Sequence, residues 1–155
     1  MRHGPSTFGD FKCSHCHAMV SSVHFLSGVN NRNHCPYCLW SCHLDLYAAG
    51  DRLSACKGQM RPVGLTLKRD RNKYRRETGG ELMLIHQCTD CGTLSINRIA
   101  ADDDAATILD VYESSIENQI HTFCEVNGIA ALRSTDSVNL HKQLFGGNEI
   151  PVPVW

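Results

Sequence analysis

Two closely spaced cysteine pairs near the N-terminus constrain the fold of this chain more than any other feature. Each pair follows the pattern Cys-x-x-Cys, and 18 residues separate the inner cysteines of the two pairs. A two-residue gap lets one tight turn direct two thiolates at one ion, and Zn²⁺ takes about four such ligands in a tetrahedron. This spacing is typical of zinc ribbons and treble clefs. The sequence therefore predicts a first zinc site formed by Cys13, Cys16, Cys35 and Cys38.

A third pair, Cys88 and Cys91, predicts a second zinc site whose ligands come from distant parts of the chain. Cys56 is the expected third ligand, because it lies just before the first strand of a predicted hairpin that brings it beside Cys88. We choose His43 as the fourth ligand. The alternatives that stay open are Cys42, His86 and Cys124. Gly92 follows the third pair where a left-handed turn residue belongs. Four protein ligands leave no open coordination position, so both zinc ions are expected to be structural.

The other histidines are expected to have lesser roles. His34 precedes Cys35 and is interpreted as a hydrogen-bonding neighbour of the first site rather than a ligand. His15 and His17 flank the first cysteine pair and are expected to face solvent or a partner. His121 falls off the apolar stripe of its predicted helix, so a surface position is expected.

Short apolar runs and helical periodicity predict an α+β fold: a zinc-ribbon-like, β-rich core followed by C-terminal helices. Strands are expected over residues 60–67 and 81–86, joined by a long hairpin tip at 68–80. A helix is expected from residue 105 to Asn127-Gly128, and a shorter one from 136 to 145. The apolar stripe of the longer helix comprises Ile108, Tyr112, Ile116, Ile120 and Phe123.

The 155 residues are expected to divide into four parts. An N-terminal arm (1–10) precedes a double-zinc domain (11–104) with a basic hairpin insert (68–80). A helical extension (105–147) and an extended C-terminal tail (148–155) follow. Aromatic residues make up 7% of the chain, so the core is expected to be modest and to need support from metal.

Charge is segregated along the chain although the net charge is only −1. Residues 57–76 carry a net charge of +7, and residues 101–155 carry −7. Basic side chains around one aromatic ring suit phosphate contacts with a stacking platform, so the hairpin insert is a candidate RNA-binding segment. The candidate RNA-binding residues are Arg61, Lys68, Arg69, Arg71, Lys73, Tyr74, Arg75 and Arg76.

Several motifs resemble the RNHCP domain family. They begin with Arg32-Asn33-His34-Cys35-Pro36 and continue with Cys38-Leu39-Trp40-Ser41, His43-x-Asp45 and Gly50-Asp51-Arg52. They also include His86-x-Cys88-x-x-Cys91-Gly92 and Asn97-Arg98-Ile99-Ala100. The resemblance covers about residues 11–104. It implies a small zinc-binding domain and leaves the function open. The insert at 68–80 departs from the family pattern, which has a short turn there.

The polar residues within these motifs have two interpretations. The first is a network of charge pairs and backbone caps that joins the two zinc lobes. The second is a site for phosphate or an RNA backbone. The residues concerned are Arg32, Asn33, Asp45, Arg52, Asn97 and Arg98.

The leading functional hypothesis is a non-enzymatic, RNA-contacting zinc protein of a ribonucleoprotein assembly such as a ribosome, including an organellar one. Its partners would be RNA at the hairpin and other proteins at the N-terminal arm, the acidic helices and the tail. One alternative is a protein-interaction adaptor or regulator without nucleic acid. Another is a metal-assisted hydrolase or nuclease with a site around Arg32, His34 and Asp45, although no His-x-Glu stands beside a cysteine pair.

The sequence also bears on location. No apolar segment of signal-peptide type begins the chain, and no apolar run approaches the roughly 18 residues that a membrane span needs. An odd number of cysteines, nine in all, and three tight Cys-x-x-Cys pairs fit thiolate–metal chemistry in a reducing compartment. We therefore expect an intracellular protein without a membrane partner, in the cytoplasm or an organelle matrix such as that of the mitochondrion.

Overall fold

The computed structural model of the protein describes residues 10–21, 34–43, 56, 58–68 and 80–145. Within them, a two-stranded hairpin pairs β1 (Phe11–Lys12) with β2 (Met19–Val20). A four-stranded antiparallel sheet has the order β3-β4-β5-β6. Its strands are β3 (Ser41–Cys42), β4 (Gln59–Lys68), β5 (Glu81–Cys88) and β6 (Leu94–Arg98). The helices are α2 (Ala105–Glu117), α3 (His121–Val126), the 3₁₀ turn η2 (Ser134–Asp136) and α4 (Ser137–Phe145). The predicted α+β class is confirmed.

Strands β4 and β5 form the long hairpin that the sequence predicts. Their pairing runs from Met60↔Cys88 to Lys68↔Glu81, with a register shift between Pro62 and Gly64. Proline lacks a backbone N–H and is tolerated in sheets at such irregularities. The end of the hairpin therefore carries the basic insert, whose residues 69–79 lie outside the described part of the chain. Strand β6 was not predicted.

Helix α2 begins where the sequence predicts. The Asp104 side chain accepts a hydrogen bond from the backbone N–H of Thr107 at 3.0 Å, which satisfies one of the free N–H groups of the first turn. The backbone N–H of Asp104 donates to the carbonyl of Pro36 at 3.0 Å, which fixes the start of the helix beside the second cysteine pair. Helix α4 agrees with the shorter helix predicted from residue 136 to 145.

The single helix predicted up to Asn127 is wrong, because the structure contains two helices. Gln119 takes a left-handed conformation with φ 52°. The N–H of Gln119 bonds to the carbonyl of Ile116 at 3.2 Å, and the N–H of Ile120 bonds to the carbonyl of Ser115 at 3.4 Å. This pair of bonds is the Schellman termination, which normally uses glycine at the left-handed position. A glutamine there gives no recognisable stop in the sequence.

The break changes which side chains α3 buries. Phe123, assigned to the apolar stripe by periodicity, is 45% exposed, whereas Cys124 is fully buried. Helix α3 ends at Asn127, and Gly128 takes φ 79° in a second Schellman termination. The Asn127-Gly128 stop is therefore confirmed, although it ends a different helix.

The main core lies between the sheet and helices α2 and α4. Its buried residues are Leu39, Leu65, Leu82, Leu84, Ile108, Val111, Tyr112, Leu132 and Leu140. Strand and helix residues on both sides of position 104 thus contribute to one core. The segment after α3 also extends the sheet edge, because Ala131 forms an antiparallel bridge with Thr66 and the N–H of Leu132 donates to the carbonyl of Leu65 at 2.8 Å.

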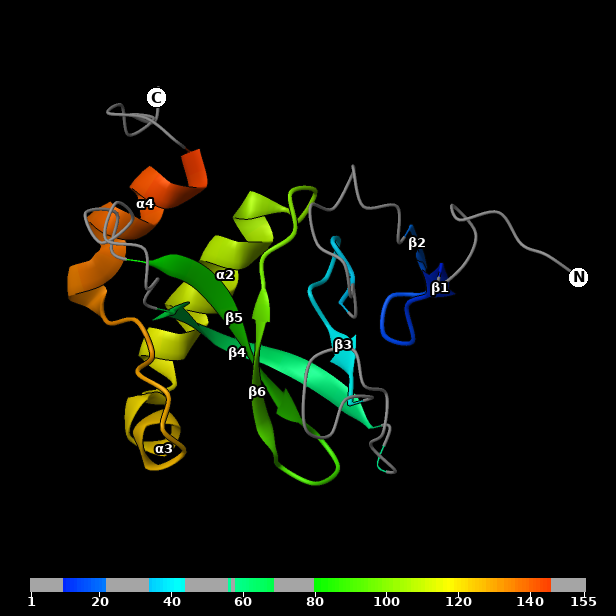
Figure 1. The fold of residues 1–155 in the computed structure, drawn as a ribbon, viewed down its shortest axis with the longest axis horizontal. Helices are drawn as coiled ribbons and strands as arrows, with labels where there is room; N and C mark the ends of the chain where they lie inside the picture. Colours follow the sequence, from blue (N-terminus) through cyan, green and yellow to red (C-terminus); the bar gives the residue numbers. More distant parts are fainter. Residues whose placement is uncertain (1–9, 22–33, 44–55, 57, 69–79, 146–155) are drawn as a thin grey trace, which may run out of the picture.

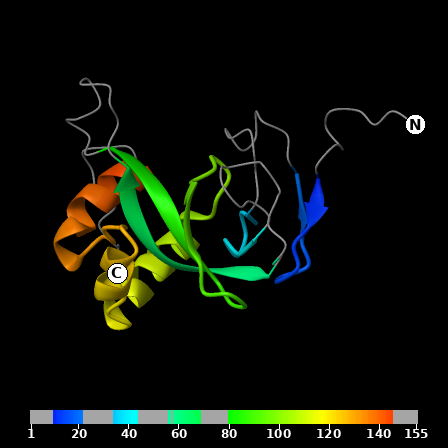
Figure 2. The ribbon, with the colours of Figure 1, turned by 60° about the horizontal axis from the view of Figure 1, so that its bottom comes forward.

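The described elements are arranged along the long axis of the molecule, with β1 and β2 at one end and the helices at the other (Figure 1). Turning the molecule shows the same order, with the four-stranded sheet between them (Figure 2). No helix among the described residues combines the length and apolar character that a membrane span requires.

Candidate metal centres

Three turns of the chain share one backbone design. In each, the N–H of the residue after the second cysteine donates to the carbonyl of the first cysteine. That following residue has a positive φ in all three turns. The donors are His17 (φ 68°), Leu39 (φ 66°) and Gly92 (φ 79°), and their bonds to Cys13, Cys35 and Cys88 measure 2.9, 2.8 and 3.0 Å. The three Cys-x-x-Cys pairs are thus three knuckles of the same type.

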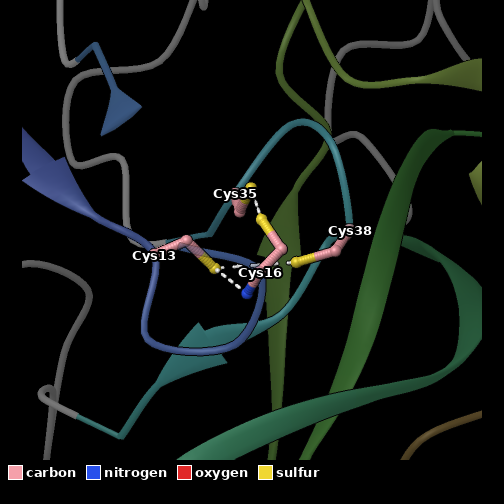
Figure 3. Close-up of side chains that lie close together, drawn as sticks. All are labelled: Cys13, Cys16, Cys35 and Cys38. Carbon is pink, nitrogen blue, oxygen red and sulfur yellow. Dashed lines mark hydrogen bonds between the residues drawn. The ribbon is translucent and has the colours of Figure 1, made fainter. Parts of the chain in front are cut away.

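The first candidate site joins the knuckle between β1 and β2 to the knuckle before β3 (Figure 3). The Sγ atoms of Cys13 and Cys38 are 3.6 Å apart, and those of Cys16 and Cys35 are 3.5 Å apart. These separations exclude disulfides, which need about 2.05 Å. A tetrahedral Zn²⁺ with Zn–S bonds of about 2.3 Å places its sulfurs about 3.8 Å apart. The four predicted ligands therefore fit one tetrahedral ion.

Backbone amides also prepare these sulfurs for negative charge. The N–H groups of His15 and Cys16 point to the Sγ of Cys13 at 3.4 Å. Burial raises the pKa of this thiol, but these amides together with the Cys38 and Cys16 side chains outweigh burial and leave the pKa below its ordinary value. Burial raises the pKa of the Cys35 and Cys38 thiols. A cation at the centre would supply the charge that ionises such a crowded group of thiols.

The second candidate site lies where β3, β4 and β5 meet. The Sγ atoms of Cys56 and Cys88 are 3.6 Å apart, and the Sγ of Cys91 is 3.4 Å from Nδ1 of His43. A tetrahedral zinc would separate a sulfur and a nitrogen ligand by about 3.6 Å. All four ligand atoms lie within 4.8 Å of one another. The backbone N–H of His43 donates to the carbonyl of Gly58 at 2.8 Å, which holds the imidazole beside the third knuckle.

Thr93 is a contributor to this site that the sequence analysis missed. Its side chain is 3.2 Å from the Sγ of Cys91. Hydrogen bonds from Thr93, first through its side chain and then through its backbone, lower the pKa of Cys91 to about 6. Cys91 is exposed, so the thiolate at this position is held by hydrogen bonds rather than by burial.

The structure separates the three alternative ligands from the cluster. Cys42 lies beside His43 but its Sγ is 3.6 Å from the hydroxyl of Ser14. His86 is fully buried. Its Nε2 donates to the carbonyl of Leu39 at 2.6 Å, and its Nδ1 accepts from Asn97 at 2.8 Å. Cys124 is buried in a separate apolar cluster of α3. His43 is the candidate that completes the group of four.

The remaining histidines take positions of three kinds. His34 is 1% exposed, and its Nε2 lies 2.6 Å from the Asp103 carboxylate, so its partner is the turn before α2 rather than a metal ligand. His15 and His17 are exposed as expected, and the His15 ring stacks on Trp40 with centroids 3.9 Å apart. The surface position expected for His121 is wrong in part. It is half-buried, and its Nε2 bonds to the carbonyl of Leu132 at 2.8 Å.

Two members of the polar motif set are described, and both have partners within the domain. Asn97 bonds to His86, and Arg98 pairs with Glu81 at 2.7 Å on the surface. Of the candidate RNA-binding residues, Arg61 and Lys68 are exposed on β4. Ten predicted site residues lie outside the described residues: Arg32, Asn33, Asp45, Arg52, Arg69, Arg71, Lys73, Tyr74, Arg75 and Arg76.

Two clusters of four cysteine and histidine ligands on a small β-rich core define a domain of the metal-binding knuckle class. A family model, that of the RNHCP domain, matches residues 8–109. The chain therefore belongs to the RNHCP domain family. No curated protein and no solved structure matches it.

Proposed function

We propose that this protein is a non-enzymatic zinc protein that holds a basic hairpin against RNA within a ribonucleoprotein assembly. The observation that carries the proposal is the position of the basic insert. Strands β4 and β5 pair as far as Lys68↔Glu81, so both ends of the segment 69–79 are anchored on the central hairpin of the sheet. That segment holds five of the eight basic residues between positions 57 and 76.

Zinc is the metal that the ligands suit best. Thiolate and imidazole ligands in groups of four are typical of structural Zn²⁺. In both clusters the protein supplies all four ligands, so no coordination position is left for a water or a substrate. The metals then stabilise the domain, which has few aromatic residues for its core, and they take no part in a reaction.

Electrostatics support RNA as the partner of the hairpin. Arg61 and Lys68 are exposed on β4, which continues directly into the basic insert. The helical extension is acidic, so a polyanion would be attracted to the hairpin and repelled from the helices. Ribosomal RNA, in the cytoplasm or in an organelle, is the specific partner that we propose.

The test uses the native, full-length protein. RNA that co-purifies with it is sequenced, and binding of the enriched RNA is then measured against salt. The test variant changes Arg69, Arg71, Lys73, Arg75 and Arg76 to Gln. The control variant changes Arg133 and Lys142, the two basic residues of the helical extension, to Gln.

The test variant should retain two zinc ions per chain and lose most of its RNA affinity. Each phosphate contact in single-stranded RNA contributes about 0.7 to the slope of log K against log salt, so the slope should fall by up to about 3.5. The control variant should bind as the wild type does. Absence of enriched RNA, or equal binding by the test variant, would exclude RNA binding through the hairpin.

A protein-interaction adaptor is the second candidate, and one observation favours it. Helix α3, within the acidic helical extension, exposes two apolar side chains, Phe123 (45% exposed) and Val126 (81% exposed). Enrichment of protein partners without RNA in the same purification would favour this alternative.

A further inference from the structure

A groove runs between helix α2 and strand β4, with the second knuckle at one end. Its volume is about 490 Å³, within the range of roughly 300–1,000 Å³ that small-molecule sites occupy. Helix α2 and its C-cap line it with residues spaced three or four apart, namely Thr107, Asp110, Ser114 and Asn118. Strand β4 lines it with Arg61, Pro62 and Val63. Of the residues that line the groove, Cys38 alone belongs to a metal cluster.

The lining of the groove combines an aromatic ring with two opposite charges. Trp40 and Cys38 form the knuckle wall, Asp110 lies on the helix wall, and Arg61 lies on the strand. Both charged residues are exposed, and neither side chain makes an ion pair or hydrogen bond with a described residue. A cation and a carboxylate thus line one groove, and both are available to a ligand.

Trp40 is held in position by the first metal site. His15, from the first knuckle, stacks on its indole at 3.9 Å with an interplanar angle of 4° and does not line the groove. Trp40 itself follows the second knuckle, two residues after Cys38. Ligation of both knuckles by one ion therefore fixes the aromatic wall before a ligand arrives.

Hydrogen bonds tie the helix wall of the groove to the wall formed by the second knuckle. The N–H of Asp104 bonds to the carbonyl of Pro36 at 3.0 Å, and Asp103 bonds to buried His34 at 2.6 Å. These contacts fix the start of α2 to the second knuckle. The groove is therefore preformed, which reduces the entropy lost when a ligand binds.

We propose that this groove binds one unpaired guanine nucleotide of the RNA, a step that rests on the proposed function. Bases stack on aromatic rings such as Trp40, and unpaired bases expose their Watson–Crick edges to protein. Guanine is the common base with two adjacent donors on that edge, N1–H and N2–H, and a carboxylate such as Asp110 accepts both. Arg61 supplies a cation for the neighbouring phosphate.

The test uses full-length, zinc-loaded protein carrying Trp155→Phe, which leaves Trp40 as the one tryptophan. Its fluorescence is titrated with GMP, AMP, CMP and UMP and with the RNA pentamers UUGUU and UUAUU. GMP and UUGUU should quench it saturably, and UUGUU should bind at least about fivefold tighter than UUAUU. UUGUU should also bind at least as tightly as GMP. Binding of GMP without UUGUU would refute RNA as the source of the nucleotide.

Three variants of this protein complete the test. Asp110→Asn should abolish the preference for guanine, while Glu113→Gln, its neighbour outside the groove, should keep it. Arg61→Gln should weaken both pentamers by a similar factor. Absence of saturable quenching by any guanine ligand, or an unchanged preference in Asp110→Asn, would overturn the proposal.

The experiments distinguish a failure of the groove proposal from a failure of the hairpin proposal. The variant with five Gln substitutions in the insert should lose affinity for long RNA and keep its quenching by GMP. Long RNA that binds the wild type without any guanine preference refutes the groove and leaves the hairpin proposal standing. If UUGUU quenches the fluorescence but the five Gln substitutions in the insert leave the affinity for long RNA unchanged, guanine binding in the groove is supported and RNA binding by the hairpin is refuted.

Discussion

The contact between His34 and Asp103 should be among the most important for stability outside the metal clusters. The His34 and Asp103 side chains are 2% and 0% exposed, and they lie 2.6 Å apart. The Asp103 carboxylate also accepts the backbone N–H of Ala100 at 2.8 Å. Through these bonds, one carboxylate joins the second knuckle to the turn that begins α2. We predict that Asp103→Ala strongly destabilises the domain.

The expected magnitude follows from burial. Removing the carboxylate takes one hydrogen-bond acceptor from the buried His34 ring and one from the backbone N–H of Ala100. Each such loss costs about 1–3 kcal/mol, so Asp103→Ala should cost about 2–6 kcal/mol. Asp103→Asn keeps one carbonyl oxygen as an acceptor, so its cost should be nearer 1–3 kcal/mol, roughly that of a weakened hydrogen bond to a charged group. A domain of this size is stable by about 5–15 kcal/mol in total, so the Ala variant should lose a large part of its stability.

The measurement is urea unfolding at saturating zinc, followed by far-UV circular dichroism. Asp110→Ala, on the exposed face of α2, is the control and should change stability by about 0.5 kcal/mol or less. The His34→Ala and Asp103→Ala double mutant should show a coupling energy above about 1 kcal/mol. If the free energy of unfolding of Asp103→Ala lies within about 1 kcal/mol of the wild-type value, the contact is not an important structural tie and the reasoning is refuted.

Three further predictions concern the second metal site, the buried histidine and the helices. His43→Ala should lower the zinc content, measured by elemental analysis, from two ions per chain to one, whereas Cys42→Ser should leave two. If both variants contain the same amount of zinc, His43 is not a ligand. Burial, and then the charge of His34, lower the pKa of His86 to about 3 from 6.5. Because the unfolded chain takes up this proton and the folded one does not, stability should fall as pH drops below about 6.5, by about 2 kcal/mol at pH 5. His86→Gln should make stability depend less on pH, in samples whose zinc content is checked at each pH. If stability falls as steeply with pH as in the wild type, His86 is not the group responsible. Tyr112→Phe should cost about 1 kcal/mol in urea unfolding, because the hydroxyl donates to the carbonyl of Arg133 at 2.6 Å, and an unchanged midpoint would show that this bond contributes nothing.

The metal clusters were the most predictable part of this protein, because ligand chemistry and spacing are local features of the sequence. The position of His43 at the second site depends on a long-range feature that spacing does not show, the pairing of β3 with β4, which places His43 opposite Gly58. His86 is an equally suitable fourth ligand by residue type and lies close to Cys88 in the sequence. The strand directs it into the core instead, where both ring nitrogens have partners.

The helices show where sequence patterns fail. Two Schellman terminations use the same hydrogen bonds, at Gln119 and at Gly128. Only the second has glycine, the usual residue at the left-handed position, so only the second was predicted from the sequence. Ile120 packs against the cluster of Ile85, Cys124 and Ala131, and this packing favours the first termination. Helical periodicity in the sequence does not reveal such tertiary packing. The tie between His34 and Asp103 spans 69 positions and was missed for a similar reason.

Leu39 links metal supply to the survival of the protein in a cell. It closes the second knuckle with a left-handed backbone, and its side chain is fully buried among the main core residues between the sheet and α2. A chain without metal keeps the hydrogen bonds of this turn but loses the ligation that joins it to the first knuckle. The packing of Leu39 in the core should then weaken and the unfolded fraction should rise. Cellular proteases remove unfolded chains continuously, and a loss of 1–2 kcal/mol can change abundance several-fold. We therefore expect the amount of this protein to follow the zinc available during its synthesis.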